Sequence, residues 1–359
     1  MFWFKKNTFL GIDFGNSSIK IVELKIRNNK PVLSNYAWMD LRYAEGLKMD
    51  EKVWGLCLKK ILKEGEIKGK NAYASISSPG SLVVLFELPE MAKEDLDQAV
   101  RFEAHKYVPV SSMEDVIISW DILGSSLQDY PEKAMTIPEP NKKSHKTMQI
   151  LLVAASKSRV EKCEKIIANV GLELESIEVE NFALVRSLIG NDQGNFIIAE
   201  IGSVVCNIIL VEKGIIKSSR NIDAGGGDIT KMISSSLQID EKRAEQMKVS
   251  GENFFNSELG INLPILETIV GEIKKVLYNY YKSEDNSRLN GIILSGGTAE
   301  LKGIEAYFSN ILKVKTFVGN PLSRISYDQH LDPILSKNKT RFSVALGLAL
   351  KGAEKYQNK

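Results

Sequence analysis

The sequence predicts an α/β protein made of two duplicated domains, with a smaller α+β module inserted between them. Three observations indicate this fold. The chain has 359 residues, enough for two domains that each bury a core. One glycine-containing hairpin pattern occurs near the start of each half of the chain, and helical patterns fall between the two copies.

The first hairpin pattern is GIDFGNSSIKIVEL, residues 11–24. Ile12 and Phe14 precede the turn and Ile19 and Ile21 follow it, with the alternation of half-buried strands. The segment therefore predicts two strands joined by a Gly/Ser turn.

The second pattern is AEIGSVVCNIILVEKG, residues 199–214. It repeats the order of an acidic residue, an apolar residue, a glycine, a small turn and an apolar strand. Asp13 and Gly15 thus correspond to Glu200 and Gly202. This repeat predicts a duplicated domain with a site shared between the copies.

Helical patterns follow each hairpin. They cover residues 51–63, a segment from Ser156 that stops at Gly171, and a long segment that begins at Pro264. The apolar residues at helical spacing are Val53, Leu56, Cys57 and Ile61 in the first, Val160, Cys163, Ile167 and Val170 in the second, and Ile269, Ile273, Val276, Leu277 and Tyr280 in the third.

The middle of the chain reads as a separate module. Residues 83–178 mix the strand patterns VVLFELP, VIISWDIL and QILLVAAS with two helices, which indicates an inserted α+β subdomain. Within it, residues 124–148 are polar and contain three prolines, so we expect a long mobile loop.

Composition excludes several classes of protein. A formal net charge of +2 argues against nucleic-acid binding. The three cysteines lack CxxC spacing and the three histidines are scattered, which argues against disulfides and a structural metal. The longest uncharged run, 201–211, is far shorter than the roughly 20 residues that span a bilayer, and the opening MFWFKK is no signal peptide.

The Gly/Ser turns are candidates for phosphate binding. Backbone amides in such turns converge on anions, and two facing turns could enclose the phosphates of a nucleotide. Asp13 offers hard oxygens for Mg²⁺, held through water, and Lys20 could neutralise phosphate charge. A purely structural turn is the alternative for either hairpin alone.

Two further glycine motifs extend this set. GIILSGGTAELKGI, residues 291–304, places Gly296 and Gly297 after an apolar strand, where backbone can approach a ligand closely. It fits neither the Walker nor the GxGxxG pattern. Residues 224–248 supply a glycine turn, a helix, and then Glu245 and Lys248 one turn apart, which taken alone would be an ordinary surface pair.

The order of these four motifs resembles the actin, Hsp70 and sugar kinase superfamily. Within it, the sequence resembles the PilM family of type IV pilus assembly proteins, itself similar to the cell-division protein FtsA. The likeness covers nearly the whole chain. It is carried by residues 11–24, by 88–123 with its RFEAHKYVP stretch, by GGGDITKMI and AEQMK, and by FSVALGLALKG near the end.

This resemblance implies an actin-like, ribonuclease H-like fold with mixed sheets, an interdomain nucleotide cleft and an inserted FtsA-like subdomain. The implied limits are 1–82, 179–190 and 340–359 for the first actin-like domain, 83–178 for the inserted subdomain, 191–230 and 288–339 for the second actin-like domain, and 231–287 for a helical subdomain.

The resemblance also implies that ATP and Mg²⁺ are bound in this cleft. The implied cofactor-binding residues are Asp13, Gly15, Asn16, Ser17, Ser18, Lys20, Gly202, Ser203, Gly226, Glu245, Lys248, Gly296 and Gly297, with Mg²⁺ on Asp13 through water. Glu200 and Glu180 are the candidate catalytic residues. Glu200 stands where relatives generally have Asp, and Cys206 where Thr is common. Misplacement of about 1 Å can cost ~10²-fold in rate, so we expect slow or absent hydrolysis.

The implied function is that of an ATP-binding protein of type IV pilus assembly that couples its nucleotide state to the inner-membrane assembly complex. The expected partners are the cytoplasmic N-terminal peptide of PilN, in a groove between the first domain and the inserted module near residues 99–110, and other pilus assembly proteins including the assembly motor, with self-association as a further option. The protein would be cytoplasmic and reach the inner membrane only through partners. The alternatives are an FtsA-like membrane or cytoskeleton adaptor and a small-molecule phosphotransferase of the sugar kinase type.

Overall fold

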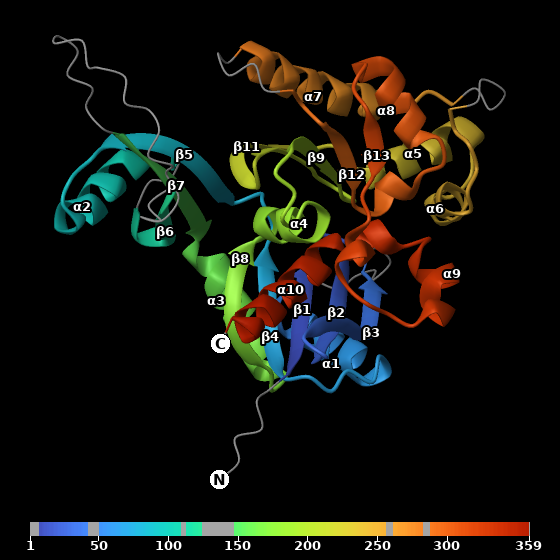
Figure 1. Ribbon diagram of the computed structural model, residues 1–359. Coiled ribbons are helices and arrows are strands. Elements are labelled where there is room, and N and C mark those ends of the chain that lie inside the picture. Colours follow the sequence, from blue (N-terminus) through green and yellow to red (C-terminus); the bar gives the residue numbers. More distant parts are fainter. Residues whose placement is uncertain are drawn as a thin grey trace. The chain divides into compact units, whose positions relative to one another are not determined.

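The computed structural model describes residues 7–41, 50–108, 113–123, 147–255, 261–282 and 288–358. The predictions for residues 1–6 and for nearly all of the loop at 124–148 lie outside these residues. The chain forms two compact units (Figure 1). The main unit comprises Met1–Pro79 and Arg159–Lys359, and the inserted unit comprises Gly80–Ser158.

The main unit contains two sheets of the same topology, which confirms the predicted duplication (Figure 1). The first sheet has the order β3-β2-β1-β4-β8, from Lys30–Asp40, Ser18–Arg27, Thr8–Phe14, Asn71–Ile76 and Glu173–Val179. The second has the order β11-β10-β9-β12-β13, from Ile215–Ile222, Cys206–Glu212, Asn195–Ile201, Gly291–Ser295 and Thr316–Val318. In each, three antiparallel strands are followed by two parallel ones. We call each sheet with its helices a lobe.

The two predicted hairpins are the first two strands of each lobe, and their turns are equivalent. The amide of Gly15 donates to the carbonyl of Ser18 at 3.0 Å, and that of Gly202 donates to the carbonyl of Val205 at 3.0 Å. Asp13 lies opposite Lys20 in the β1–β2 ladder. The sequence repeat therefore corresponds to a repeated backbone geometry.

Four longer helices pack in the first lobe: α1 (Glu51–Glu64), α3 (Lys157–Asn169), α4 (Glu180–Leu188) and α10 (Ser343–Gln357). Gly11 of β1 and Gly347 of α10 allow this close packing. A Cβ on Gly11 would lie 1.8 Å from the Ala345 carbonyl oxygen, and one on Gly347 would lie 1.9 Å from that of Ala183.

One prediction for α1 was wrong in detail. Leu56 was expected on the packed face, but its side chain is 68% exposed. Leu58 is fully buried in its place, together with the predicted Ile61. In so short an apolar pattern, more than one face of the helix could be the buried one, and packing against the sheet selects which face it is.

The second lobe contains α5 (Gly226–Leu237), α6 (Glu241–Val249), α7 (Pro264–Lys282) and α8 (Ile304–Leu312). The apolar stripe predicted on α7 is buried in the core of this lobe, which confirms its packing role. The short helices Gly297–Glu300 (η3), Pro321–Arg324 (η4), Gln329–Leu331 (η5), Asp332–Leu335 (α9) and Lys339–Phe342 (η6) complete the main unit.

The inserted unit is an antiparallel sheet of order β5-β7-β6, from Ser81–Pro89, Thr147–Ser156 and Val116–Leu123. Helix α2 (Lys93–Ala104) packs on it through Leu96 and Val100, and Met113–Asp115 forms one short turn. The predicted strands are present, but the unit spans Gly80–Ser158 whereas we expected 83–178. The reason is that β8 pairs with β4 in the first sheet of the main unit. Among the described helices, none has the length and apolar character needed to cross a bilayer.

Candidate functional site

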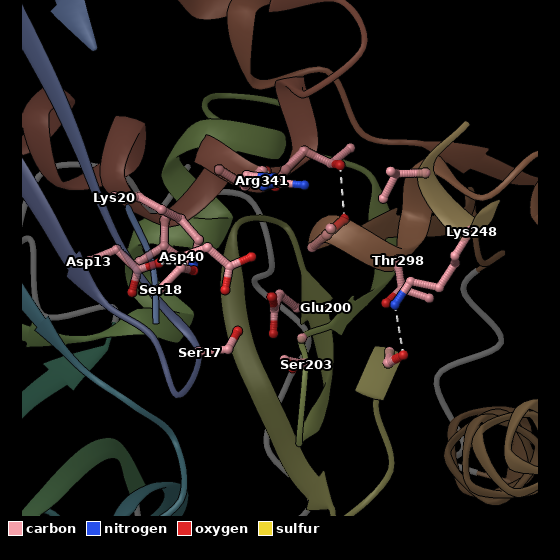
Figure 2. A pocket seen from close by; sticks show the side chains of 18 of the residues that line it. Asp13, Ser17, Ser18, Lys20, Asp40, Glu200, Ser203, Lys248, Thr298 and Arg341 are labelled. Carbon is pink, nitrogen blue, oxygen red and sulfur yellow. Dashed lines mark hydrogen bonds and ion pairs between the residues drawn. The ribbon is translucent and has the colours of Figure 1, made fainter. Parts of the chain in front are cut away.

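A polar cleft between the two lobes of the main unit collects the predicted site residues (Figure 2). Asp13 and Glu200, the two acids of the repeated hairpins, line the same cavity. The predicted residues around it are Asp13, Gly15, Asn16, Ser17, Ser18, Lys20, Glu180, Glu200, Gly202, Ser203, Gly226, Glu245, Lys248, Gly296 and Gly297. An adjoining cavity extends from Glu245, Lys248 and Thr298 toward Trp38 and Asn338.

Asp13 and Lys20 form an ion pair on the first-lobe wall. The Lys20 Nζ lies 2.8 Å from the Asp13 Oδ2, and the Ser75 hydroxyl donates to the Asp13 Oδ1 at 3.4 Å. Burial lowers the pKa of Lys20, but attraction to Asp13 and the hydrogen bond to it outweigh burial, so that the pKa is raised. Lys20 is therefore a permanent cation in the cleft.

Glu200 and Glu180 form an acidic pair facing this cation. Burial raises the pKa of Glu200 to about 8, the nearby Glu180 adds to the rise, and Lys20 opposes it. Burial likewise raises the pKa of Glu180 to about 7, against the lowering effect of the hydrogen bond that its Oε1 accepts from the Ser78 amide at 2.8 Å. Both carboxyls thus exchange protons near neutral pH.

The N-terminus of α5 is fixed against the second hairpin. The amides of Gly226 and Gly227 donate to the carbonyls of Gly202 and Ser203, each at 2.8 Å. A Cβ at Gly225 would lie 2.5 Å from the Ser203 carbonyl oxygen, so only glycine fits this approach. The amides of Gly226 and Gly227 are taken by protein acceptors, so what the N-terminus of α5 offers an anion at this point of the cleft is its partial positive charge.

Glu245 and Lys248 form a buried ion pair. From their spacing in the sequence alone, they would be assigned to the surface. Their charged atoms lie 2.6 Å apart, and the two side chains are 11% and 9% exposed. The Lys248 Nζ also donates to the Gly226 carbonyl at 2.8 Å and to the Thr230 hydroxyl at 2.7 Å. The pair therefore ties α6 to the first turn of α5 at the cleft wall.

The Gly296–Gly297 motif closes the cleft beneath Glu200. Gly296 has a φ of +83°, and a Cβ there would lie 2.4 Å from the Ile201 carbonyl oxygen. Gly297 has open space around its Cα, so packing does not require glycine at that position.

Sequence reasoning missed several cleft residues on other elements. Trp38 and Asp40 of β3 pair with Lys20 and Ser18 of β2 and share their face of the sheet. The Arg341 guanidinium lies 5.5 Å from the centre of the Trp38 ring and lines both cavities. Thr298, Thr340 and Ser343 also contribute to the wall. The alternation of residues 30–40 could have indicated that Trp38 and Asp40 share one face of a strand. Their place in the cleft could be inferred only once the register of β3 was known.

These groups fit a magnesium nucleotide. The amides of Asn16, Ser17 and Ser203 donate to no backbone acceptor among the described residues, and Asp13 lines the same cavity with its carboxylate oxygens. A metal that retains water and shares phosphate oxygens needs only one or two such carboxylates. Within the described chain, no cluster of three or more His, Cys, Asp or Glu side chains is placed to hold a metal.

Comparison with known proteins relates the chain to a family. The model of the family described as type IV pilus assembly protein PilM matches residues 11–353. FtsA of Streptococcus pneumoniae serotype 2 is 21% identical over 356 residues, which cover 88% of this chain and 76% of that protein. FtsA of Neisseria meningitidis serogroup B is 23% identical over 308 residues, with 77% and 70% covered.

Solved structures show the same fold. The PilM-PilN type IV pilus biogenesis complex matches with a TM-score of 0.77 and 22% identity, covering 96% of this chain and 98% of that one. MreB5 of Spiroplasma citri bound to ADP matches with a TM-score of 0.54 and 14% identity, covering 98% of each chain. The actin-like, duplicated fold is thereby confirmed.

Proposed function

The chain belongs to the PilM family of type IV pilus assembly proteins, and from this premise we propose that it binds ATP with Mg²⁺ between its lobes and passes the nucleotide state to a partner. The observation that carries the proposal is the placement of Asp13 and Glu200, from the two hairpins, in the wall of one cleft. A similar fold in MreB5 holds ADP, which supports a nucleotide as the ligand.

Each wall of the cleft has a proposed part. Asp13 would hold Mg²⁺ through water, and the ion would supply charge neutralisation at the phosphates. Lys20, the turns that begin at Gly15 and Gly202 with the amides of Asn16, Ser17 and Ser203, and the N-terminus of α5 with Gly226 would surround the phosphates. Glu245 and Lys248 would lie along the ribose and adenine, with Gly296 and Gly297 at the floor of the cleft.

We propose that hydrolysis is slow or absent because the cleft holds its second acid in the wrong protonation state. With a pKa of about 8, Glu200 is mostly protonated at neutral pH and cannot serve as an effective base there. Glu180, with a pKa of about 7, is half ionised and is the better candidate to orient a water.

The proposed partner is the N-terminal cytoplasmic peptide of PilN, and the inserted unit supplies a fitting surface. Both β5 and β6 are edge strands of its sheet. Phe102 on α2 is 73% exposed and Ile117 on β6 is 43% exposed. An extended peptide could add to an edge and place apolar side chains beside these residues. PilN binding would also bring the protein to the inner membrane, with no direct contact of its own.

The nucleotide proposal is tested by calorimetric titration with ATP and Mg²⁺. Wild-type protein should bind, and Asp13→Ala should weaken binding at least tenfold, which corresponds to ~1.4 kcal/mol. Asp95→Ala is the matched control, since Asp95 is an exposed carboxylate on α2 in the inserted unit. Absence of binding by the wild type, or equal affinity of the Asp13 and Asp95 variants, would refute the proposal.

A further inference from the structure

Three buried polar side chains form a hydrogen-bonded triangle next to Glu180, one of the acids that line the cleft. Ser78, Asn181 and Asn207 are 2%, 1% and 0% exposed. The Ser78 hydroxyl donates to the Asn181 Oδ1 at 2.5 Å, and the Asn207 Nδ2 lies 2.7 Å from the Ser78 Oγ and 2.6 Å from the Asn181 Oδ1. We call these three residues the cross-lobe clasp.

The clasp joins the two lobes of the main unit. Ser78 follows β4, and Asn181 lies in the first turn of α4, which packs against α10 and β8 of the first lobe. Asn207 lies on β10 of the second lobe. Both hydrogen bonds that the Asn207 amide donates therefore cross from one lobe to the other.

The same residues are connected to both acids of the cleft. The Ser78 amide donates to the Glu180 Oε1, and Asn181 directly follows Glu180 in the chain. Asn207 lies opposite Glu200 in the β9–β10 ladder, so their side chains leave the same face of the sheet. A change in the angle between the lobes must therefore move these contacts and the two carboxyls together.

Directional hydrogen bonds make this link specific to one geometry. Apolar side chains at such a position could slide past one another at small cost, whereas a buried donor that loses its acceptor is left unsatisfied. The clasp thus favours one angle between the lobes over neighbouring ones.

We propose that Ser78, Asn181 and Asn207 are positioning residues that hold the lobes at the nucleotide-binding angle and keep the Glu180 carboxyl directed into the cleft. This inference rests on the proposed nucleotide binding for its effect on affinity. Its effect on the exchange of the Ser78 amide is measured without nucleotide and therefore stands independently.

Asn207→Leu tests the clasp by removing both cross-lobe hydrogen bonds while keeping the number and branching of the side-chain heavy atoms and adding no charge. We expect about a tenfold or greater rise in the Kd for Mg²⁺-ATP. In the nucleotide-free protein we expect faster hydrogen exchange of the Ser78 amide, which the clasp holds on Glu180. Ser78→Ala, a smaller change, should shift the Kd in the same direction if Asn207→Leu does not fold.

Asn195→Leu is the matched control. Asn195 is also a buried asparagine of the second lobe, 7% exposed, and its Nδ2 donates to the Tyr280 hydroxyl at 3.1 Å. Like Asn207, it has an Oδ1 without a partner among the described residues. It lies at the opposite end of β9 from Glu200, so its replacement should cost stability without changing the Kd or the exchange of the Ser78 amide.

The outcomes separate the two proposals. If wild-type protein fails to bind Mg²⁺-ATP, the proposed function falls, while faster exchange in Asn207→Leu alone would still support the clasp. If Asn207→Leu and Asn195→Leu have the same Kd and the same exchange at Ser78, the clasp is overturned, whatever the wild type binds.

Discussion

At the scale of single residues, the two hairpin acids occupy equivalent positions in different surroundings. Asp13 pairs directly with Lys20 at 2.8 Å. Glu200 has a longer side chain and lies beside Glu180, and its pKa is raised to about 8 by burial and by that second carboxyl. One repeated motif therefore supplies an acid paired with a lysine on one wall and an acid beside a second carboxyl on the other.

The pH dependence of stability should report this difference. A carboxyl with a folded-state pKa of about 8 keeps its proton where the unfolded chain, with its ordinary value of 4.5, has lost it. The free energy of unfolding should therefore fall as pH rises from about 4.5 to 8, by up to ~1.4 kcal/mol per pH unit for one proton, and then level off.

Glu200→Gln should flatten this dependence and stabilise the protein at pH 8 relative to the wild type, because the amide never ionises. Urea unfolding at a series of pH values provides the measurement. Glu64→Gln, at an exposed position on α1, serves as control. Equal pH profiles for wild type and Glu200→Gln would contradict the assigned environment.

Lys248 offers a second test at this scale. Removing one member of a buried pair leaves the other charge unpaired, at a cost of about 3–5 kcal/mol. Lys248→Met should therefore destabilise the protein on this order, because the Glu245 carboxylate keeps the hydrogen bond from the Thr230 hydroxyl but loses its cation. Lys60→Met is the control, since Lys60 and Glu64 are both 64% exposed and 3.9 Å apart; its effect should stay below about 0.5 kcal/mol. Comparable losses in the two variants would show that the Glu245–Lys248 pair is not buried.

At the scale of elements, the strands and helices with strong periodicity were predictable from sequence. The hairpins at 11–24 and 199–214, the stripe on α7 and the strand Val116–Leu123 all appear as expected. Whether a helix or a strand forms depends on local residue patterns, which can be read directly from the sequence. The burial of Leu58 and the exposure of Leu56 on α1 were not predictable, because packing against the sheet determines which face of the helix is buried.

Gly11 permits the close contact between β1 and α10. Gly11→Ala would place a Cβ 1.8 Å from the Ala345 carbonyl oxygen, on backbone that cannot yield locally. We expect destabilisation of about 1–3 kcal/mol or more. Gly55→Ala on α1 meets nothing within 4 Å and should instead stabilise by ~0.5–1 kcal/mol. Thermal unfolding of both variants measures these changes in stability. If Gly11→Ala left the stability unchanged, α10 would not be packed against β1 as described.

At the scale of the whole molecule, the sequence repeat indicated two related halves, and the family resemblance indicated the cleft between them. The Gly-rich motifs located most of its wall. The sequence motifs did not identify Trp38, Asp40 and Arg341 as cleft residues. Trp38 and Asp40 reach the cleft through the register of β3 against β2, and Arg341 reaches it from a distant part of the chain. The end of the inserted unit was misplaced for a related reason, since the pairing of β8 with β4 is a long-range contact.

Partner binding is expected to depend on the inserted unit. Phe102→Ser should weaken capture of the N-terminal PilN peptide about tenfold or more, because it removes an exposed aromatic anchor. Leu56→Ser removes another exposed apolar side chain, from α1 of the main unit, and should leave capture unchanged. Fluorescence anisotropy with a labelled peptide provides the measurement. If Phe102→Ser binds like the wild type, α2 is not part of the partner surface.

The most direct test of the central proposal is a crystal structure of the protein with Mg²⁺ and a non-hydrolysable ATP analogue. We predict that the phosphates lie between the turns at 15–18 and 202–203, with the metal on the Asp13 side and the ribose beside Glu245 and Lys248. Nucleotide density at any other surface, with the two hairpins left apart from it, would contradict the account.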